Sequence, residues 1–366
     1  MAVELARAFA AAGHPVLLAD SVAARDARWS RVGRGRCLRL PAPRDDAGAY
    51  RAALRALIDA HRPAWILPTC EEVFHVAAAA AACGFADRVF APSFGLLRTL
   101  HSKIDFPAFA RSLGIAAPQT WAIAERADCA ALPLPPDALV FKPEFSRFGT
   151  STLIRPSSAA LRRIDATAHR RWAAQRHVEG EEICLWTAIR AGRVVASAAY
   201  RPRWRLGHAA SYAFETVSSP QALRVAETIA GATGLSGQLS FDIVLTADGA
   251  AVPIECNPRA VSGVHLFDGD PALADALLGR GSPVHAPPRL RYLAPAMLLF
   301  GLPQALRDGR MREFVRDVRR GRDALTRPGD RLPAAGALLD TLGYALRGGA
   351  TRGSTADIEW NGEPLA

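Results

Sequence analysis

Lysine is nearly absent from this sequence. Arginine accounts for all but two of its 45 basic residues, and the two lysines are Lys103 and Lys142. Where arginine replaces lysine almost everywhere, the lysines that persist mark places where a planar guanidinium does not fit. A compact ammonium that acts as a point charge on phosphate is one such role, and an ordinary surface lysine is the alternative.

Long apolar runs and paired cysteines are also missing. No run reaches the roughly 18 to 20 apolar residues that a membrane-spanning helix needs. The opening MAVELARAFAAAG predicts an amphipathic helix rather than a secretory signal. The six cysteines are scattered, with no CxxC and no Cys/His pair at zinc-binding spacing. We therefore expect reduced thiols and a cytoplasmic location.

The common nucleotide and hydrolase signatures are absent. There is no P-loop, and the GxG of VGRGR at 32–36 is not followed by the helix start of a Rossmann fingerprint, so Asp20 at a strand end does not indicate NAD. GxSxG, HExxH and the kinase HRD motif are missing too. The net charge of +10 would suit nucleic acid. The arginines are spread along the chain without a recognition motif, so we expect no nucleic-acid partner.

The first 99 residues alternate between helical and strand patterns, which is typical of a parallel α/β unit. The predicted helices are VELARAFAAAG, AYRAALRALIDAHRP and FHVAAAAAACG, and the predicted strands are PVLLADS and AWILPTCEE. The chain opens on a helix, whereas a doubly wound unit starts with a strand and a Gly-rich turn. We expect that the first strand is missing, through truncation rather than because it is dispensable.

The rest of the chain changes character twice. A helix in SKIDFPAFARSLG is followed from about 138 to 265 by short strands, interrupted by the helix PQALRVAETIAGATG. After about residue 290 the pattern predicts helices, including a basic helix over 311–325. Its apolar stripe is Met311, Phe314, Val315 and Val318. That helix fits three roles: packing on the domain, contact with an anionic membrane surface, or contact with another chain.

Two acids are placed to share a cation. Asp242 lies in LSFDIVL and Glu255 in VPIECNPR, with the turn TADGA between them. Adjacent strands of a hairpin can place one residue each on the same face, and Asn257 follows Glu255 at the spacing that keeps that face. Two carboxylates and an amide oxygen suit Mg²⁺. The alternative, a surface hairpin with solvated acids, fits these apolar runs poorly.

Five short stretches occur in a fixed order: SK at 102–103, VFKP at 140–143, QRHVEGEE at 175–182, FD at 241–242 and IECNPR at 254–259. This ordered set resembles the ATP-grasp superfamily, in the carboxylate–amine ligase branch related to the large chain of carbamoyl-phosphate synthetase. The resemblance covers roughly residues 100–270 and, more loosely, 1–100. Ser240 departs from it, because some ligases carry arginine there.

The resemblance implies an α/β fold with three parts. An incomplete Rossmann-like, pre-ATP-grasp domain is expected over 1–99. The ATP-grasp domain is expected over 100–290, with a small lid over about 119–180. A helical C-terminal extension is expected over 291–366.

The resemblance also implies roles for individual residues. Arg259 and Lys142 would act on the transferred phosphoryl group, although Arg259 could instead pair with Glu255. One or two Mg²⁺ ions, or Mn²⁺, would be held by Asp242, Glu255 and Asn257. ATP would be held by Lys103, Lys142, Ser146, Gly149, Thr150, Ser151, Gln175, Arg176, His177, Val178 and Glu182. The loop EFSRFGTST would cover the phosphates, or it is an ordinary hairpin turn in which Arg147 is solvated.

The implied reaction is ATP-dependent activation of a carboxylate as an acyl phosphate, followed by attack of an amine or similar nucleophile. The partners would be small carboxylates and amines, and a homodimer is compatible with the sequence. Three other functions stay open: a carboxylate kinase, a nucleotide-binding module without turnover, and a basic membrane- or nucleic-acid-associated protein. Weaker candidates for substrate contact are Glu71, Ser262, Gly263, His265, Arg201, Arg203 and Arg205. Each also has a structural explanation, as a helix N-terminal acid, a packed residue or a solvated strand end.

Overall fold

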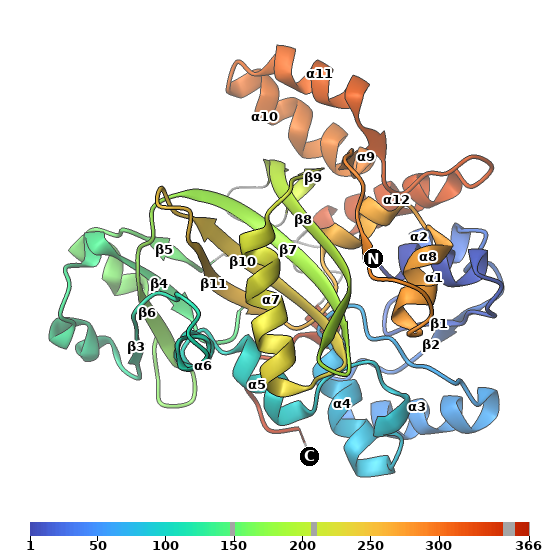
Figure 1. The fold of residues 1–366 in the computed structure, drawn as a ribbon, viewed down its shortest axis with the longest axis horizontal. Helices are drawn as coiled ribbons and strands as arrows, with labels where there is room; N and C mark the ends of the chain where they lie inside the picture. Colours follow the sequence, from blue (N-terminus) through green and yellow to red (C-terminus); the bar gives the residue numbers. More distant parts are fainter. Residues whose placement is uncertain (147–150, 206–210, 347–355, 366) are drawn as a thin grey trace.

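The computed structural model describes residues 1–146, 151–205, 211–346 and 356–365. These residues form an N-terminal α/β unit, a small four-stranded sheet, a large eight-stranded sheet and a helical region beyond it (Figure 1). In Figure 1 the small sheet lies at one end of the molecule and the N-terminal unit at the other.

The N-terminal unit carries five helices around a short parallel sheet. Strands β1 (Leu18–Asp20) and β2 (Cys37–Arg39) pair in parallel. The predicted strand AWILPTCEE is reduced to one parallel bridge between Ile66 and Val89, and β2 was not predicted. The helices are α1 (Ala2–Ala11), α2 (Arg25–Trp29), α3 (Ala47–His61), α4 (Glu72–Cys83) and α5 (Phe94–His101), with a 3-10 turn at Ala86–Arg88.

Local signals set several of these helix ends. The Asp46 side chain accepts a hydrogen bond from the Ala49 amide and caps α3, and Ser93 caps α5 in the same way. Gly84 ends α4 in the left-handed conformation. The predicted helix at SKIDFPAFARSLG is α6 (Asp105–Ser112), which follows α5 after a break that contains Lys103.

The small sheet is antiparallel, with the strand order β3-β6-β4-β5. Alternate side chains of β4 and β6, such as Phe141 and Trp172, pack into the core of this sheet, so that Lys142 and Gln175 face the other way. The strands are β3 (Thr120–Ile123), β4 (Leu139–Pro143), β5 (Leu153–Ile154) and β6 (Trp172–Arg176), with 3-10 turns at Arg126–Ala131, Pro136–Ala138 and Ser158–Arg163.

The large sheet has the order β11-β10-β7-β8-β9-β13-β14, and β12 pairs with β8. Helices α6 and α7 (Pro220–Thr233) cover one face. Helix α1, α8 (Pro271–Leu277) and a 3-10 turn at Ser262–Phe267 pack on the other. The strands are β7 (Glu181–Arg190), β8 (Arg193–Arg205), β9 (Ser211–Thr216), β10 (Gly237–Leu245), β11 (Ala251–Asn257), β12 (Val284–His285), β13 (Leu290–Tyr292) and β14 (Arg322–Asp323).

The region after residue 290 is not purely helical, because β13 and β14 extend the large sheet. The basic helix also ends earlier than predicted, at Arg320. Its apolar residues Met311, Phe314 and Val318 pack against Trp204, whereas Val315 stays exposed. Packing on the domain therefore accounts for the stripe. The helices are α9 (Ala294–Ala296), α10 (Leu302–Arg307), α11 (Met311–Arg320) and α12 (Leu332–Leu346), with a π-helical turn at Met297–Gly301.

The C-terminal segment, residues 356–365, returns to the N-terminal unit beside α4 and α5 (Figure 1). It starts with a 3-10 turn at Ala356–Ile358. Trp360 is buried, stacks on Phe74 with ring centroids 4.6 Å apart and contacts Phe145 at 4.7 Å. No pattern in the sequence predicted this return.

A set of charges, most of them buried, ties α1 to distant parts of the chain, and we call it the N-terminal ion network. Glu4 pairs with Arg327 at 2.8 Å, and Arg7 pairs with Asp330 at 2.8 Å. The network comprises Glu4, Arg7, His265, Asp268, Arg289, Arg291, Arg327 and Asp330. Across the parts of the chain that the structure describes, none of the helices combines the length and the apolar character needed to cross a bilayer.

Candidate active site

A cleft lies between the small sheet and the large sheet, and its cavity measures about 270 Å³. Lys142 and Gln175 line it from the small sheet, and Asp242 and Glu255 line it from the large one. The strands dictate this arrangement. Phe241 and Cys256 pack into the core beneath α7, so the neighbouring Asp242 and Glu255 face the cleft.

The two lysines approach this cleft from different elements. Lys142, on β4, donates a hydrogen bond to the Gln175 Oε1 atom at 3.3 Å. Lys103, between α5 and α6, donates to the Ser146 carbonyl at 2.9 Å, and its Nζ lies 3.7 Å from Glu255 Oε1. Both side chains are buried. Burial lowers the pKa of Lys142, and the nearby Glu255 charge opposes that shift.

Asp242 and Glu255 are direct partners on the antiparallel strands β10 and β11. Burial and the neighbouring Glu255 charge raise the pKa of Asp242 to about 6. The Cys184 thiol, which donates to Asp242 Oδ1 at 3.3 Å, and the Lys142 charge act in the opposite direction. Two facing carboxylates whose charges are so poorly balanced form a site that favours a bound cation.

Arg259 connects this pair to the N-terminal unit. Its Nη2 donates to Asn257 Oδ1 at 2.9 Å and lies 3.4 Å from Glu71 Oε1, at the start of α4. The Glu71 side chain is fully buried. The sequence left open a bond between Arg259 and Glu255, but the arginine pairs with Glu71 instead. The predicted substrate contact at Glu71 therefore reaches the site through Arg259.

The oxygen atoms at this place suit a magnesium ion. Asp242, Glu255 and Asn257 offer two carboxylates and one amide oxygen, which are the hard ligands that Mg²⁺ takes together with water and phosphate oxygens. Within the described ranges, no three His, Cys, Asp or Glu side chains gather as a metal cluster. The set present is therefore incomplete on its own, and phosphate and water would have to complete it.

The segment between β6 and β7 forms another part of the wall. The five predicted nucleotide contacts Gln175, Arg176, His177, Val178 and Glu182 all line the cleft. Main-chain bonds hold this segment in place, because the Arg176 amide donates to the Gln119 carbonyl at 2.8 Å and the His177 amide to the Ala138 carbonyl at 2.9 Å. Glu182 pairs with Arg205 at 2.6 Å. Arg205 also lines the cleft, although the sequence indicated it only as a weaker candidate for substrate contact.

The predicted phosphate loop is only partly described. Gly149 and Thr150, with Arg147, lie outside the described residues. Ser146 and Ser151 line a second, larger hollow rather than the cleft, whereas Thr152 lines the cleft itself. The predicted phosphate loop EFSRFGTST includes Thr152, so among the described residues only this last part of the loop lines the cleft.

Some of the weaker candidates for substrate contact line the cleft and others do not. Ser262 lines the cleft. Gly263 does not, because it is packed so tightly that an added Cβ would lie 2.8 Å from the Trp186 Cβ. His265 belongs to the N-terminal ion network, with its Nδ1 3.8 Å from Glu4 Oε2. Burial lowers the pKa of His265 despite that contact.

The arginines of YRPRWR also serve different purposes. Arg201 pairs with Glu181 at the surface, and Arg203 pairs with Asp317 on α11 at 3.1 Å, so neither contacts the cleft. The sequence analysis missed Cys184 and Tyr200, which line the cleft from β7 and β8. Cys184 could have been found from its place two residues after Glu182 on a strand, which puts both on one face.

Neither a model of a known protein family nor a curated protein matches the sequence. Solved structures do match the fold. A phosphoribosylamine–glycine ligase from Thermotoga maritima is 14% identical, with a TM-score of 0.58 over 78% of this chain and 75% of that one. A carboxyaminoimidazole ribonucleotide synthase from Aspergillus clavatus, complexed with ATP, is 15% identical, with a TM-score of 0.59 over 78% of both chains.

A third structure is the biotin carboxylase domain of 2-oxoglutarate carboxylase from Hydrogenobacter thermophilus, a dimer in complex with MgADP, ADP and bicarbonate. It is 13% identical to this chain, with a TM-score of 0.57 over 76% of this chain and 67% of that one. At these identities the likeness concerns the fold. The chain therefore has the ATP-grasp fold that these three enzymes share.

Proposed function

We propose that this protein is an ATP- and Mg²⁺-dependent ligase that activates a carboxylate as an acyl phosphate for attack by an amine or similar nucleophile. The observation that carries the proposal is the cluster of charged side chains at the cleft. The buried Lys142 ammonium, a pair of facing carboxylates and the Arg259 guanidinium line one cavity, and the buried Lys103 ammonium lies 3.7 Å from one of those carboxylates, Glu255. A structural role does not need that combination.

The cleft supports binding of ATP between the two sheets. The main chain and side chains from Gln175 to Val178 would surround the adenine, and Glu182 would hold the ribose. Lys142 would contact the phosphates from the small sheet. Lys103, which lies between α5 and α6 and donates to the Ser146 carbonyl, would contact the same phosphates. The similar structures solved with ATP or MgADP support this choice of nucleotide.

Asp242, Glu255 and Asn257 would hold one or two Mg²⁺ ions, with Mn²⁺ as a substitute. Bound there, the metal would neutralise charge on the phosphate oxygens of ATP. The protein's own contribution is to hold the three oxygen donors on two paired strands and to keep Arg259 beside them. Arg259 would then stabilise negative charge on the phosphoryl group in transit.

The reaction would run in two steps. A carboxylate oxygen attacks the γ-phosphorus, the bond from that phosphorus to the bridging oxygen breaks, and the electron pair leaves with ADP. The amine nitrogen then attacks the acyl carbon, phosphate leaves with the carbon–oxygen electron pair, and the nitrogen loses a proton. Both steps depend on positioning and charge neutralisation more than on a covalent catalyst, which fits the side chains present.

The test is a matrix of small carboxylates against small amines, with ADP release as the readout. Active pairs are expected to require Mg²⁺. Glu255→Gln is expected to keep the fold and to lower ADP release about a thousandfold, or about 4 kcal/mol, because it removes a charged metal ligand. Glu227→Gln is the matched control, since Glu227 is an exposed acid on α7 outside the cleft.

Unchanged turnover in Glu255→Gln would remove the paired acids from the reaction and with them the proposal. Absence of any MgATP binding by calorimetry would do the same. ADP release that needs the carboxylate but not the amine would instead identify a carboxylate kinase.

A further inference from the structure

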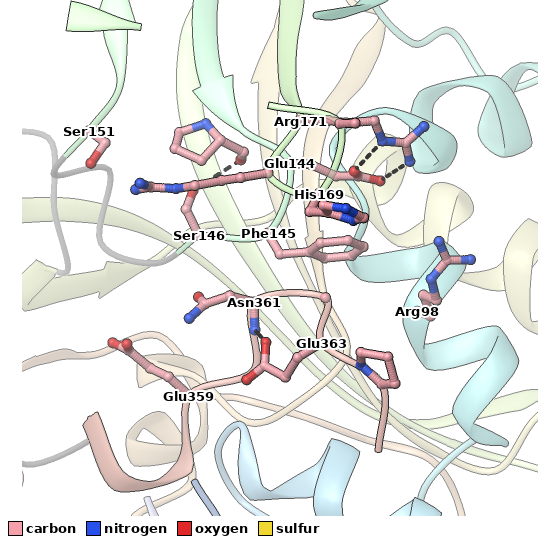
Figure 2. A pocket seen from close by; sticks show the side chains of 15 residues that line it. Arg98, Glu144, Phe145, Ser146, Ser151, His169, Arg171, Glu359, Asn361 and Glu363 are labelled. Carbon is pink, nitrogen blue, oxygen red and sulfur yellow. Dashed lines mark hydrogen bonds and ion pairs between the residues drawn. The ribbon is translucent and has the colours of Figure 1, made fainter. Parts of the chain in front are cut away.

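A second hollow, of about 940 Å³, lies outside the cleft (Figure 2). One wall consists of the ends of the small sheet around Glu144, Ser146 and Arg171, and the facing wall is the C-terminal segment at 359–364. Figure 2 shows Asn361 and Glu363 across the hollow from Ser146 and His169, with Arg98 of α5 at one side. Nothing in the proposed nucleotide site uses this space.

The hollow adjoins the phosphate end of the cleft. Ser146 lines the hollow, and its carbonyl accepts the Lys103 ammonium at 2.9 Å. The same ammonium lies 3.7 Å from Glu255. One residue, Ser146, and one side chain, that of Lys103, therefore link the hollow to the paired acids.

Most charges around the hollow are already paired within the chain. Arg171 pairs with Glu144 at 2.8 Å, Glu359 pairs with Arg44 at 3.4 Å, and Arg170 pairs with Asp165. Among the described residues that line the hollow, one arginine and one glutamate lack an ion-pair partner. Among the described residues, Arg98 has no ion-pair partner, and the Glu363 carboxylate accepts only the Asn361 amide, at 2.7 Å.

The main chain of both residues is held in place by the surrounding structure. Arg98 stands on the last turn of α5. Glu363 is held through its carbonyl, which accepts a hydrogen bond from the Trp360 Nε1 at 2.7 Å, and Trp360 is itself buried against Phe74. Arg98 and Glu363 line one hollow without pairing with each other. A cation and an anion held apart in this way complement a ligand that carries both charges.

We propose that this hollow binds one of the two small substrates, and that this substrate is a zwitterion with a carboxylate for Arg98 and an ammonium for Glu363. Amino acids and related amine-bearing acids are the chemical class. The C-terminal segment would thereby be part of the site. This inference rests on the proposed ligase function and names the substrate class for it.

The test measures binding directly by ligand-observed NMR, with the full chain in the presence of ADP and Mg²⁺. The zwitterionic probes are glycine, L-alanine, β-alanine, L-glutamate and L-lysine. Propionate and propylamine are the singly charged counterparts of β-alanine. At least one zwitterion is expected to bind, and at least about tenfold more tightly than either singly charged compound.

Two variants locate the bound zwitterion. Arg98→Ala and Glu363→Gln are each expected to weaken its binding about tenfold or more, and Arg98→Lys is expected to restore part of the loss. Arg55→Ala is the control, because Arg55 is an exposed helix arginine paired with Asp59 outside the hollow. Arg98 is exposed, so its variants are expected to keep the wild-type melting temperature, which is checked first.

The zwitterion site is overturned if no zwitterion binds, if the singly charged probes bind equally well, or if both variants bind as the wild type does. The ligase proposal is tested separately, by calorimetry of MgATP binding to the wild type. Nucleotide binding without a zwitterion preference rejects this inference alone, whereas loss of nucleotide binding rejects the function beneath it.

Discussion

The N-terminal ion network and the cleft both gather charged side chains away from solvent, but they balance charge differently. In the network each of the three carboxylates, Glu4, Asp268 and Asp330, has a guanidinium nitrogen at 2.8 Å. In the cleft Asp242 and Glu255 face each other. The one ion pair found for them among the described residues is Lys103 with Glu255, at 3.7 Å.

The pKa values report the same contrast. Burial raises the pKa of Glu4, but the contact with His265 and the charges of Arg327 and Arg7 outweigh it, and the net shift is downward. Burial and Glu255 raise the pKa of Asp242 to about 6. In the network each carboxylate has a guanidinium partner within the chain, which fits a role in supporting the fold. In the cleft the nearby cations do not offset burial and the Glu255 charge at Asp242, so the pair of acids favours a further bound cation.

The largest expected effect on stability comes from a substitution that breaks the network. Glu4→Gln leaves Arg327 and Arg7 without their shared acid, and removal of one partner from a buried pair is expected to lower the free energy of unfolding by about 3 kcal/mol. Denaturant titration measures this loss. Nucleotide affinity, measured by calorimetry below the melting range, is expected to stay unchanged.

The pH dependence of that loss has a definite sign. The pKa of Glu4 is lower in the folded chain, so its stabilisation is present above the unfolded-state pKa and is lost as pH falls through the folded-state value. Wild type and Glu4→Gln should therefore converge in stability toward acid pH. If Glu4→Gln weakened nucleotide binding without a loss of stability, the network would not be a purely structural cluster distinct from the cleft.

The second expected effect concerns the cleft. Lys142→Ala should weaken MgATP binding about thirtyfold, or about 2 kcal/mol, because a buried charge-assisted contact to phosphate is lost. Lys142→Arg tests why lysine persists here. If the compact ammonium is required, arginine will not restore affinity. Calorimetry that gives equal affinities for wild type and Lys142→Ala would remove Lys142 from the nucleotide site.

The same contrast separates what the sequence could predict from what it could not. The acids were predictable because Asp242 and Glu255 lie in one hairpin, where strand alternation and a short turn decide the face locally. The lysines were predictable because they are so rare. Strands β4 and β6 of the small sheet were also predictable from the stretches ALVFKP and AAQRHVEG, whereas β3 and β5 were not predicted.

Long-range partners escaped prediction. Trp360 is buried by Phe74 and Phe145, which are distant in sequence, so no local pattern indicates the return of the C-terminal segment. The role of His265 escaped prediction for the same reason, because its contact is with Glu4, which is far away in the sequence. This contact makes His265 part of the ion network rather than a substrate residue. Strands of two or three residues, such as β2 and β14, are too short to show a period.

A third, smaller effect joins the cleft to the N-terminal unit. Glu71→Gln should lower kcat about tenfold while the affinity for MgATP stays unchanged, because Gln keeps the shape but weakens the hold on Arg259. Glu71 acts here as a positioning residue. The split between kcat and nucleotide affinity is the deciding measurement, since a purely structural role would lower stability and leave kcat per folded molecule unchanged.

The smallest effect compares the two clusters with the same substitution. Without nucleotide or metal, Asp242→Asn is expected to stabilise the chain by about 1 kcal/mol at pH 7.5, because it removes repulsion from Glu255 while an oxygen stays for Cys184. Asp268→Asn is the control, with a φ of 64° that asparagine tolerates. It should destabilise, because Asp268 lies 2.8 Å from Arg291 and 2.9 Å from Arg327. Denaturant titration in EDTA decides between them. Equal destabilisation by both substitutions would mean that Asp242 is as well balanced as the network acids, and the cleft would lose its main electrostatic sign of a bound cation.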